Sequence, residues 1–148
     1  MTLRLRHHHL LCLLTYVGKG YSPAFIANFD AIAARASAGE EILLVEGPDD
    51  ICAPLTANLS EQQCLQTEQP HCLRDSVRRR DAQALEDLSR LLDEPLPTGK
   101  TIRLSAKTTQ HLRGSFAAGT VRTACSGCQW HDLCSAVAAE GFKGARLT

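Results

Sequence analysis

The apolar positions of the chain switch from a two-residue period to a helical period within the first twenty residues. Leu3 to Arg6 alternate apolar and basic side chains, which predicts a short strand with one buried face. The leucine-rich run that follows predicts a buried helix reaching to about Val17. Glycines at positions 18 and 20 are expected to end that helix.

The next segment carries the clearest helix signal. Ser22 is a suitable N-cap, and Pro23 stands at the first helical position, where its missing N–H costs nothing. Apolar residues then follow at helical spacing, and Gly39 closes the element. They are Phe25, Ile26, Phe29, Ile32, Ala33 and Ala36. Residues 42–45 form a continuous apolar run of strand length that stops at a Gly-Pro pair.

A second strong helix is predicted from Asp75 or Ser76 to Leu92. Its apolar side chains recur at helical spacing and are expected to face the core. They are Val77, Ala84, Leu85, Leu88, Leu91 and Leu92. Its charged residues predict a solvated face of mixed sign, because the acids offset the basic run. They are Arg78, Arg79, Arg80, Asp81, Glu86 and Asp87.

The last third of the chain is patterned less strongly. Residues 102–104 are expected to form a short strand or to lead straight into the next helix, which starts from Ser105 and ends at Gly114. An Ala-rich helix is expected after Cys134, with a frayed tail beyond it. Strands and helices in this order predict one α+β (or α/β) domain spanning residues 1–148, with helices packed on a short sheet.

The composition argues against several classes of protein. Sixteen basic residues balance sixteen acidic ones and aromatics are few, so neither charge nor stacking favours nucleic acid. No stretch reaches the roughly 18 apolar residues of a membrane span, and the apolar run near the N-terminus is too short for a secretory signal. We therefore expect a cytoplasmic protein with reduced or metal-bound thiols, acting with a redox or protein partner of unknown identity.

Three of the seven cysteines stand close together. Cys125, Cys128 and Cys134 follow the spacing C-x2-C-x5-C, beside the one Trp of the chain and a His. A C-x2-C turn lets two thiolates reach one metal, and the longer spacer lets the chain return with a third. The fourth ligand must come from elsewhere in the chain.

Two metals fit this pattern. A four-iron cluster takes four thiolates, commonly three close together and one remote, which matches the cysteines. Structural zinc usually uses two C-x2-C turns, and only one is present. Zn²⁺ is therefore the second choice, because Cys52, Cys72 or a histidine would have to complete its site. A C-x2-C pair can also act as a redox dithiol without any metal.

The fourth ligand is predicted to be Cys52 or Cys72. Cys52 follows a Gly-Pro turn after a strand, where functional loops often lie. Cys72 precedes a helix, whose N-terminal dipole stabilises a thiolate. Cys64 lies in a polar stretch without clear pattern and is the poorest candidate. Cys12 lies on an apolar helix, where a buried core cysteine is the simpler interpretation.

Two histidines can reach the face of Cys12. His8 is four positions and His9 three positions from it, which places either on the same side of a helix. They can act as ligands, as proton carriers or as the base of a Cys–His enzyme, or they can be structural. Asp49 and Asp50 can form an acid/base pair, although adjacent acids after Gly-Pro are more often turn or cap residues.

Motifs spread along the chain resemble domain-of-unknown-function family 1284. In order, they are Arg6-x-His8-His9-Leu10-Leu11-Cys12, Gly18-Lys19-Gly20-Tyr21-Ser22, Val45-Glu46-Gly47-x-Asp49-Asp50-Ile51-Cys52 and the cysteine group at 125–134. The family consists of small bacterial and archaeal proteins, and the resemblance implies iron–sulfur binding. It also implies that Cys12, Cys52 and Cys72 are family positions and that Cys64 is an extra cysteine.

The function expected from the sequence is binding of one [4Fe-4S] cluster. The ligands would be Cys125, Cys128, Cys134 and either Cys52 or Cys72, with His8, His9 and Cys12 as second-tier candidates. The cluster would serve electron transfer or redox sensing, or would brace the fold. The alternatives are a zinc-braced interaction module and a thiol enzyme that uses Cys12 with His8 or His9.

Overall fold

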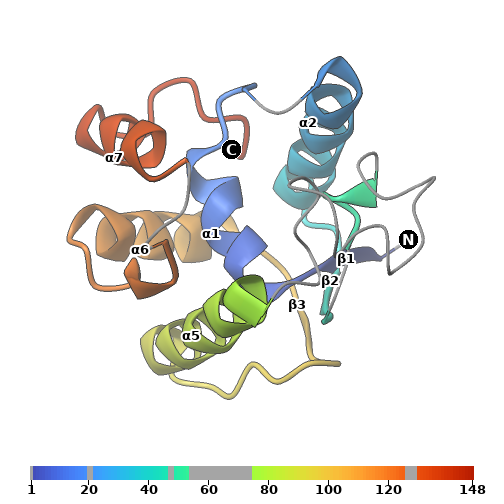
Figure 1. The fold of residues 1–148 in the computed structure, drawn as a ribbon, viewed down its shortest axis with the longest axis vertical. Helices are drawn as coiled ribbons and strands as arrows, with labels where there is room; N and C mark the ends of the chain where they lie inside the picture. The colour runs from blue at the N-terminus through green and yellow to red at the C-terminus, as the bar shows by residue number, and fades with distance from the viewer. Residues whose placement is uncertain (1, 20–21, 47–48, 54–74, 126–129) are drawn as a thin grey trace.

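A computed structural model describes residues 2–19, 22–46, 49–53, 75–125 and 130–148. Within these residues the chain forms five α-helices, one 3-10 turn and a three-stranded sheet, so the fold is α+β (Figure 1).

The sheet is small and joins distant parts of the chain. β1 (Leu3–Leu5) pairs in parallel with β2 (Ile42–Leu44), and β2 pairs antiparallel with β3 (Thr101–Ile102). Leu3 and Leu5 are fully buried whereas Arg4 between them is exposed, which confirms the alternation seen in the sequence.

Helix α1 (His7–Thr15) lies at the centre of the fold (Figure 1). Eight of its nine residues are buried, which is the pattern of a helix surrounded on all sides by protein. It contacts α5 (Asp75–Leu92), α6 (Ala106–Ala117) and α7 (His131–Ala139). The helix ends at Thr15, two residues before the predicted end at Val17.

Helix α2 (Pro23–Ser37) covers another side of this centre. Ser22 caps it by accepting a hydrogen bond from the backbone N–H of Phe25 at 3.1 Å, and Pro23 occupies the first turn, both as predicted. Phe29 stacks on Tyr16 with a centroid distance of 3.9 Å, which fixes α2 against the end of α1.

Two helices of the C-terminal third have bounds that differ from the expected ones. Helix α6 continues through Gly114 to Ala117, because the glycine that takes a left-handed conformation and ends it is Gly119. Helix α7 begins at His131, so Cys134 lies within it rather than before it.

The tail is packed rather than frayed. Leu147 is buried, the backbone N–H of Arg146 donates to the carbonyl of Tyr16 at 2.9 Å, and Arg113 donates to the carbonyl of Leu147 at 2.8 Å. None of the described helices has the length and apolar character needed to cross a bilayer.

Candidate metal centre

Three consecutive histidines open helix α1, and all three are buried. The ring nitrogen Nε2 of His7 lies 2.7 Å from the backbone carbonyl of Leu96, so this residue anchors the connection that follows α5. His8 and His9 are instead held by carboxylates. His7 therefore has a different role from His8 and His9.

His8 belongs to a buried ionic network. Its Nδ1 lies 2.5 Å from Oδ1 of Asp81 on α5, and Arg6 contacts Oδ2 of the same carboxylate through Nε and Nη2, each at 2.7 Å. Arg6 is fully buried, and Asp81 supplies the opposite charge that such a guanidinium requires.

The network shifts the protonation of both partners. Burial and the positive charge of His9 lower the pKa of His8 to about 4, although Asp81 opposes the shift. Burial alone would raise the pKa of Asp81, but His8 and Arg6 outweigh it and hold the pKa of this carboxyl well below its usual range. His8 is therefore a neutral imidazole near pH 7, whereas Asp81 is a carboxylate.

The predicted solvated face of α5 is wrong at two of its acids. Arg78, Arg79 and Glu86 are exposed as expected, but Asp81 and Asp87 are buried. Asp81 lies four positions after Val77 and three before Ala84, which places it on the apolar stripe of the helix. That position was the signal that the sequence interpretation missed.

His9 is held by Asp49. Its Nδ1 lies 2.6 Å from Oδ2 of Asp49, whose side chain is fully buried. The same carboxylate accepts hydrogen bonds from the backbone N–H groups of Arg6 at 2.8 Å, Ile51 at 3.1 Å and Cys52 at 3.2 Å.

These contacts decide the charge of Asp49 and its structural role. Burial would raise its pKa, but the charge and hydrogen bond of His9 and the backbone N–H groups lower it below the usual range. Asp50 accepts from the backbone N–H of Arg4 at 2.7 Å. Both acids therefore bind backbone N–H groups, in agreement with the turn or cap interpretation, and Asp49 also orients a histidine.

Two overlapping groups of metal-ligating side chains result. The ligand atoms of His8, His9 and Cys12 all lie within 4.8 Å of one another. Those of His9, Asp49 and Cys52 do so as well, and His9 belongs to both groups. The predicted neighbourhood of His8, His9 and Cys12 is therefore present, and the turn of Cys52 joins it through His9.

Two of the C-terminal cysteines, Cys125 and Cys134, lie within the described residues, and Cys134 contacts the end of α1. The hydroxyl of Thr15 donates to Sγ of Cys134 at 3.1 Å, and α7 contacts α1. Cys125 closes the 3-10 turn η1 (Thr123–Cys125), which contacts α5. Both thiols pack partly buried against the core. Thr15 was not predicted as a site residue, although it follows Cys12 by three positions and so shares its face of the helix.

Part of the predicted ligand set falls outside the described residues. Cys72 and Cys128 lie there, as does Cys64. Among the residues that are described, neither Cys125 nor Cys134 belongs to a group of three close ligand atoms. The joining of Cys52 or Cys72 to the C-terminal thiols therefore stays a prediction.

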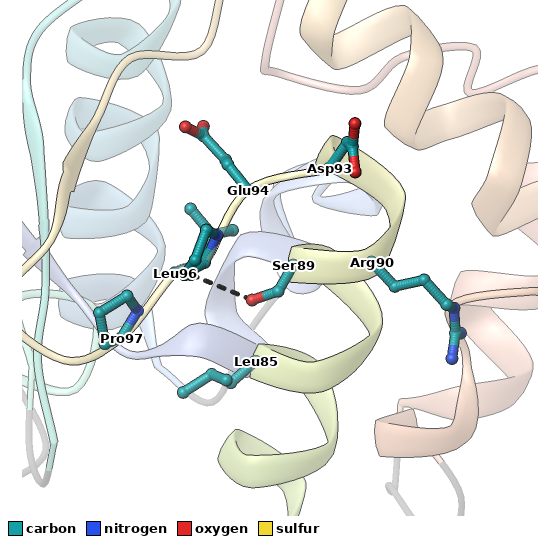
Figure 2. Close-up of a pocket in the computed structure, with 8 residues that line it drawn as sticks. Leu85, Ser89, Arg90, Asp93, Glu94, Leu96 and Pro97 are labelled. Carbon is teal, nitrogen blue, oxygen red and sulfur yellow. Dashed lines mark hydrogen bonds between the residues drawn. The ribbon is translucent and has the colours of Figure 1, made fainter.

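An open pocket of about 500 Å³ lies at the end of α5 (Figure 2). It is lined by Leu85, Ser89, Arg90, Asp93, Glu94, Pro95, Leu96 and Pro97. Ser89 accepts a hydrogen bond from the backbone N–H of Leu96 at 3.0 Å, which fixes one wall. Within the part of the chain that the structure describes, none of the cysteines or metal-ligating histidines lines this pocket, so it is separate from the two groups of ligand atoms.

Comparison with known protein families gives one match. The family described as "Protein of unknown function (DUF1284)" matches residues 20–134, which is more than half of the chain. Comparisons with curated proteins and with solved structures found no match. The match confirms the resemblance expected from the motifs, and the chain belongs to the DUF1284 family.

Proposed function

We propose that the protein binds a four-iron iron–sulfur cluster through Cys125, Cys128, Cys134 and one remote cysteine, Cys52 or Cys72. The cluster would serve one-electron transfer or redox sensing in the cytoplasm, together with a redox partner.

One observation carries this proposal. Helix α1 contacts the C-terminal cysteine group through the hydrogen bond from Thr15 to Cys134, and it contacts the turn of Cys52 through His9 and Asp49. Cysteines from positions 52 and 134 are thus gathered around one buried helix. The contact at Cys52 is made by its backbone N–H, whereas Thr15 donates to the sulfur of Cys134 itself, which a purely apolar side chain could not accept.

The chemistry of these side chains fits a thiolate-bound cluster. Cys52 is buried, and Cys125 and Cys134 are partly buried against the apolar core, which limits access of water. An O–H donor such as Thr15 favours the anionic form of a thiol and is the kind of contact that tunes the potential of a cluster. When bound, the cluster supplies the electron, and the chain supplies the ligands and the shelter.

A second candidate is a thiol enzyme that uses Cys12. The observation that favours it is the pairing of His8 and His9 with Asp81 and Asp49, because a base oriented by a carboxylate is the arrangement that activates a nucleophilic thiol. A zinc-braced module without redox function is the remaining alternative.

Anaerobic purification followed by a visible spectrum and assays of iron, acid-labile sulfide and zinc separates these candidates. The proposal predicts a coloured protein in which iron and sulfide are present in similar amounts. A colourless protein with zinc and no sulfide would contradict it. A colourless protein without metal, in which Cys12 reacts with an alkylating reagent faster than the other cysteines, would favour the thiol enzyme.

A further inference from the structure

The two histidines beside Cys12 share an unusual feature. In each of them Nδ1 is hydrogen-bonded to a buried carboxylate, at 2.5 Å for His8 and Asp81 and at 2.6 Å for His9 and Asp49. An Nδ1 that donates its hydrogen to a carboxylate leaves the lone pair on Nε2. This is the arrangement found around histidines that bind metals, where the carboxylate fixes the tautomer and strengthens the ligand.

Cys12 completes a donor set on the same helix. It lies four positions after His8 and three after His9, and the ligand atoms of the three residues lie within 4.8 Å of one another. We infer that His8, His9 and Cys12 form a site for one divalent transition-metal ion of the zinc class, separate from the proposed iron–sulfur cluster.

The donor atoms define the class of metal. Two imidazole nitrogens and one thiolate sulfur suit zinc and its neighbours in the first transition row, whereas Mg²⁺ and Ca²⁺ prefer oxygen. Cys52 reaches the same region because it shares the second group with His9 and Asp49. Its thiol is therefore a further donor close to His9.

The charges around the site also match a divalent cation. Arg6 balances Asp81 through its ion pair, so these two contribute no net charge. The carboxylate of Asp49 and a thiolate at Cys12 then supply two negative charges against the two positive charges of the ion. A buried site that is neutral overall avoids the cost of an uncompensated charge.

His7 provides a matched control within the same run of histidines. It is buried and precedes His8 on α1, but its Nε2 lies against the carbonyl of Leu96 and it belongs to neither group of ligand atoms. A histidine-rich helix that bound metal without specificity would use all three residues.

The test is anaerobic titration of the full-length, metal-free protein with Co²⁺, followed through the absorption that a cobalt–thiolate bond produces. His8→Gln, His9→Gln and Cys12→Ser are expected to weaken cobalt binding at least about 100-fold, since each removes a ligand. Asp81→Asn and Asp49→Asn are expected to weaken it about 10- to 100-fold through loss of orientation. His7→Gln should leave the affinity unchanged.

Circular dichroism of each variant identifies those that fail to fold, and Cys12→Ser keeps the test valid if a histidine variant unfolds. Unchanged cobalt affinity in a folded Cys12→Ser variant would overturn the inference, as would equal losses for His7→Gln and His8→Gln.

A triple variant with serine at 125, 128 and 134 separates this site from the proposed cluster. Cobalt binding should persist in it even though cluster binding is lost. If Cys12→Ser or His8→Gln instead removed iron and sulfide from the anaerobically purified protein, these residues would belong to the cluster and the separate site would be refuted.

Discussion

Thr15 and Cys134 are hydrogen-bonded at 3.1 Å although 119 positions separate them in the sequence. This contact ties the last helix to the central helix α1, one turn after Cys12. It places Cys134 against the N-terminal helix of the chain. The proposed metal chemistry therefore depends on a contact between the two ends of the protein.

Replacing Thr15 with Val should remove this contact with little change in side-chain volume. Loss of one hydrogen bond is expected to lower the stability of the metal-free protein by about 1 kcal/mol. In the cluster-loaded protein it should lower the one-electron reduction potential by up to about 40 mV, the equivalent of the same free energy. Urea denaturation and a redox titration measure the two effects. Thr15→Ser keeps the hydroxyl, so an equal shift in both variants would contradict this explanation.

Replacing Asp81 with Asn should destabilise the protein strongly. The substitution leaves the buried guanidinium of Arg6 without its carboxylate, which typically costs about 3–5 kcal/mol. Urea denaturation of the metal-free protein checks this value. The control is Glu86→Gln on the exposed face of the same helix, which should change stability by less than about 0.5 kcal/mol. Similar effects of the two substitutions would show that Asp81 is not the buried partner of Arg6.

The stability of the metal-free protein should fall as the pH is lowered from about 6.5 to about 4. The pKa of His8 is about 4 in the folded chain and 6.5 when unperturbed. Burial, His9 and Arg6 lower this pKa, and Asp81 raises it by a smaller amount. Between these values the unfolded state binds a proton that the folded state does not, so stability increases with pH.

The size of this effect is at most about 3 kcal/mol. It is measured by repeating urea denaturation across the pH range. His8→Gln should remove most of the slope between pH 6.5 and 4, whereas His7→Gln should keep it. An unchanged slope in His8→Gln would contradict the assigned origin.

The sequence was sufficient to predict the elements whose signals are local. The cap at Ser22, the proline at the start of α2 and the alternation at Leu3–Leu5 depend on neighbouring residues, and the structure has all of them. The predicted end of α6 was wrong because Gly114 is tolerated within a helix. The predicted start of α7 was wrong because this helix, which contains Cys134, begins at His131 without a side-chain cap that the sequence could reveal.

The candidate site could be predicted only in part. The spacing of His8, His9 and Cys12 on one helix predicted that they lie close together, because this geometry depends only on neighbouring residues. Their partners Asp81 and Asp49 are 73 and 40 positions away from the histidines, so no local pattern could pair them. Asp81 was misread because an acid after three arginines resembles a surface residue unless its place on the apolar stripe is considered.

The remote cluster ligand can be identified by separate substitutions of Cys52 and Cys72 with Ser. The true ligand should lose most of the iron and sulfide after anaerobic purification, and the other variant should keep them. Because Cys52 lies beside His9, we expect Cys52→Ser also to weaken cobalt binding at the proposed site on α1. Retention of full iron and sulfide by both variants would show that neither is the fourth ligand.

The most direct test of the proposed function is acid-labile sulfide and iron in three anaerobically purified proteins. They are the wild type, the triple serine variant at 125, 128 and 134, and Cys64→Ser as a cysteine outside the proposed site. Iron and sulfide in similar amounts are expected in the wild type and in Cys64→Ser, and neither in the triple variant. Absence of sulfide from the wild type, or an equal content in the triple variant, would contradict the account.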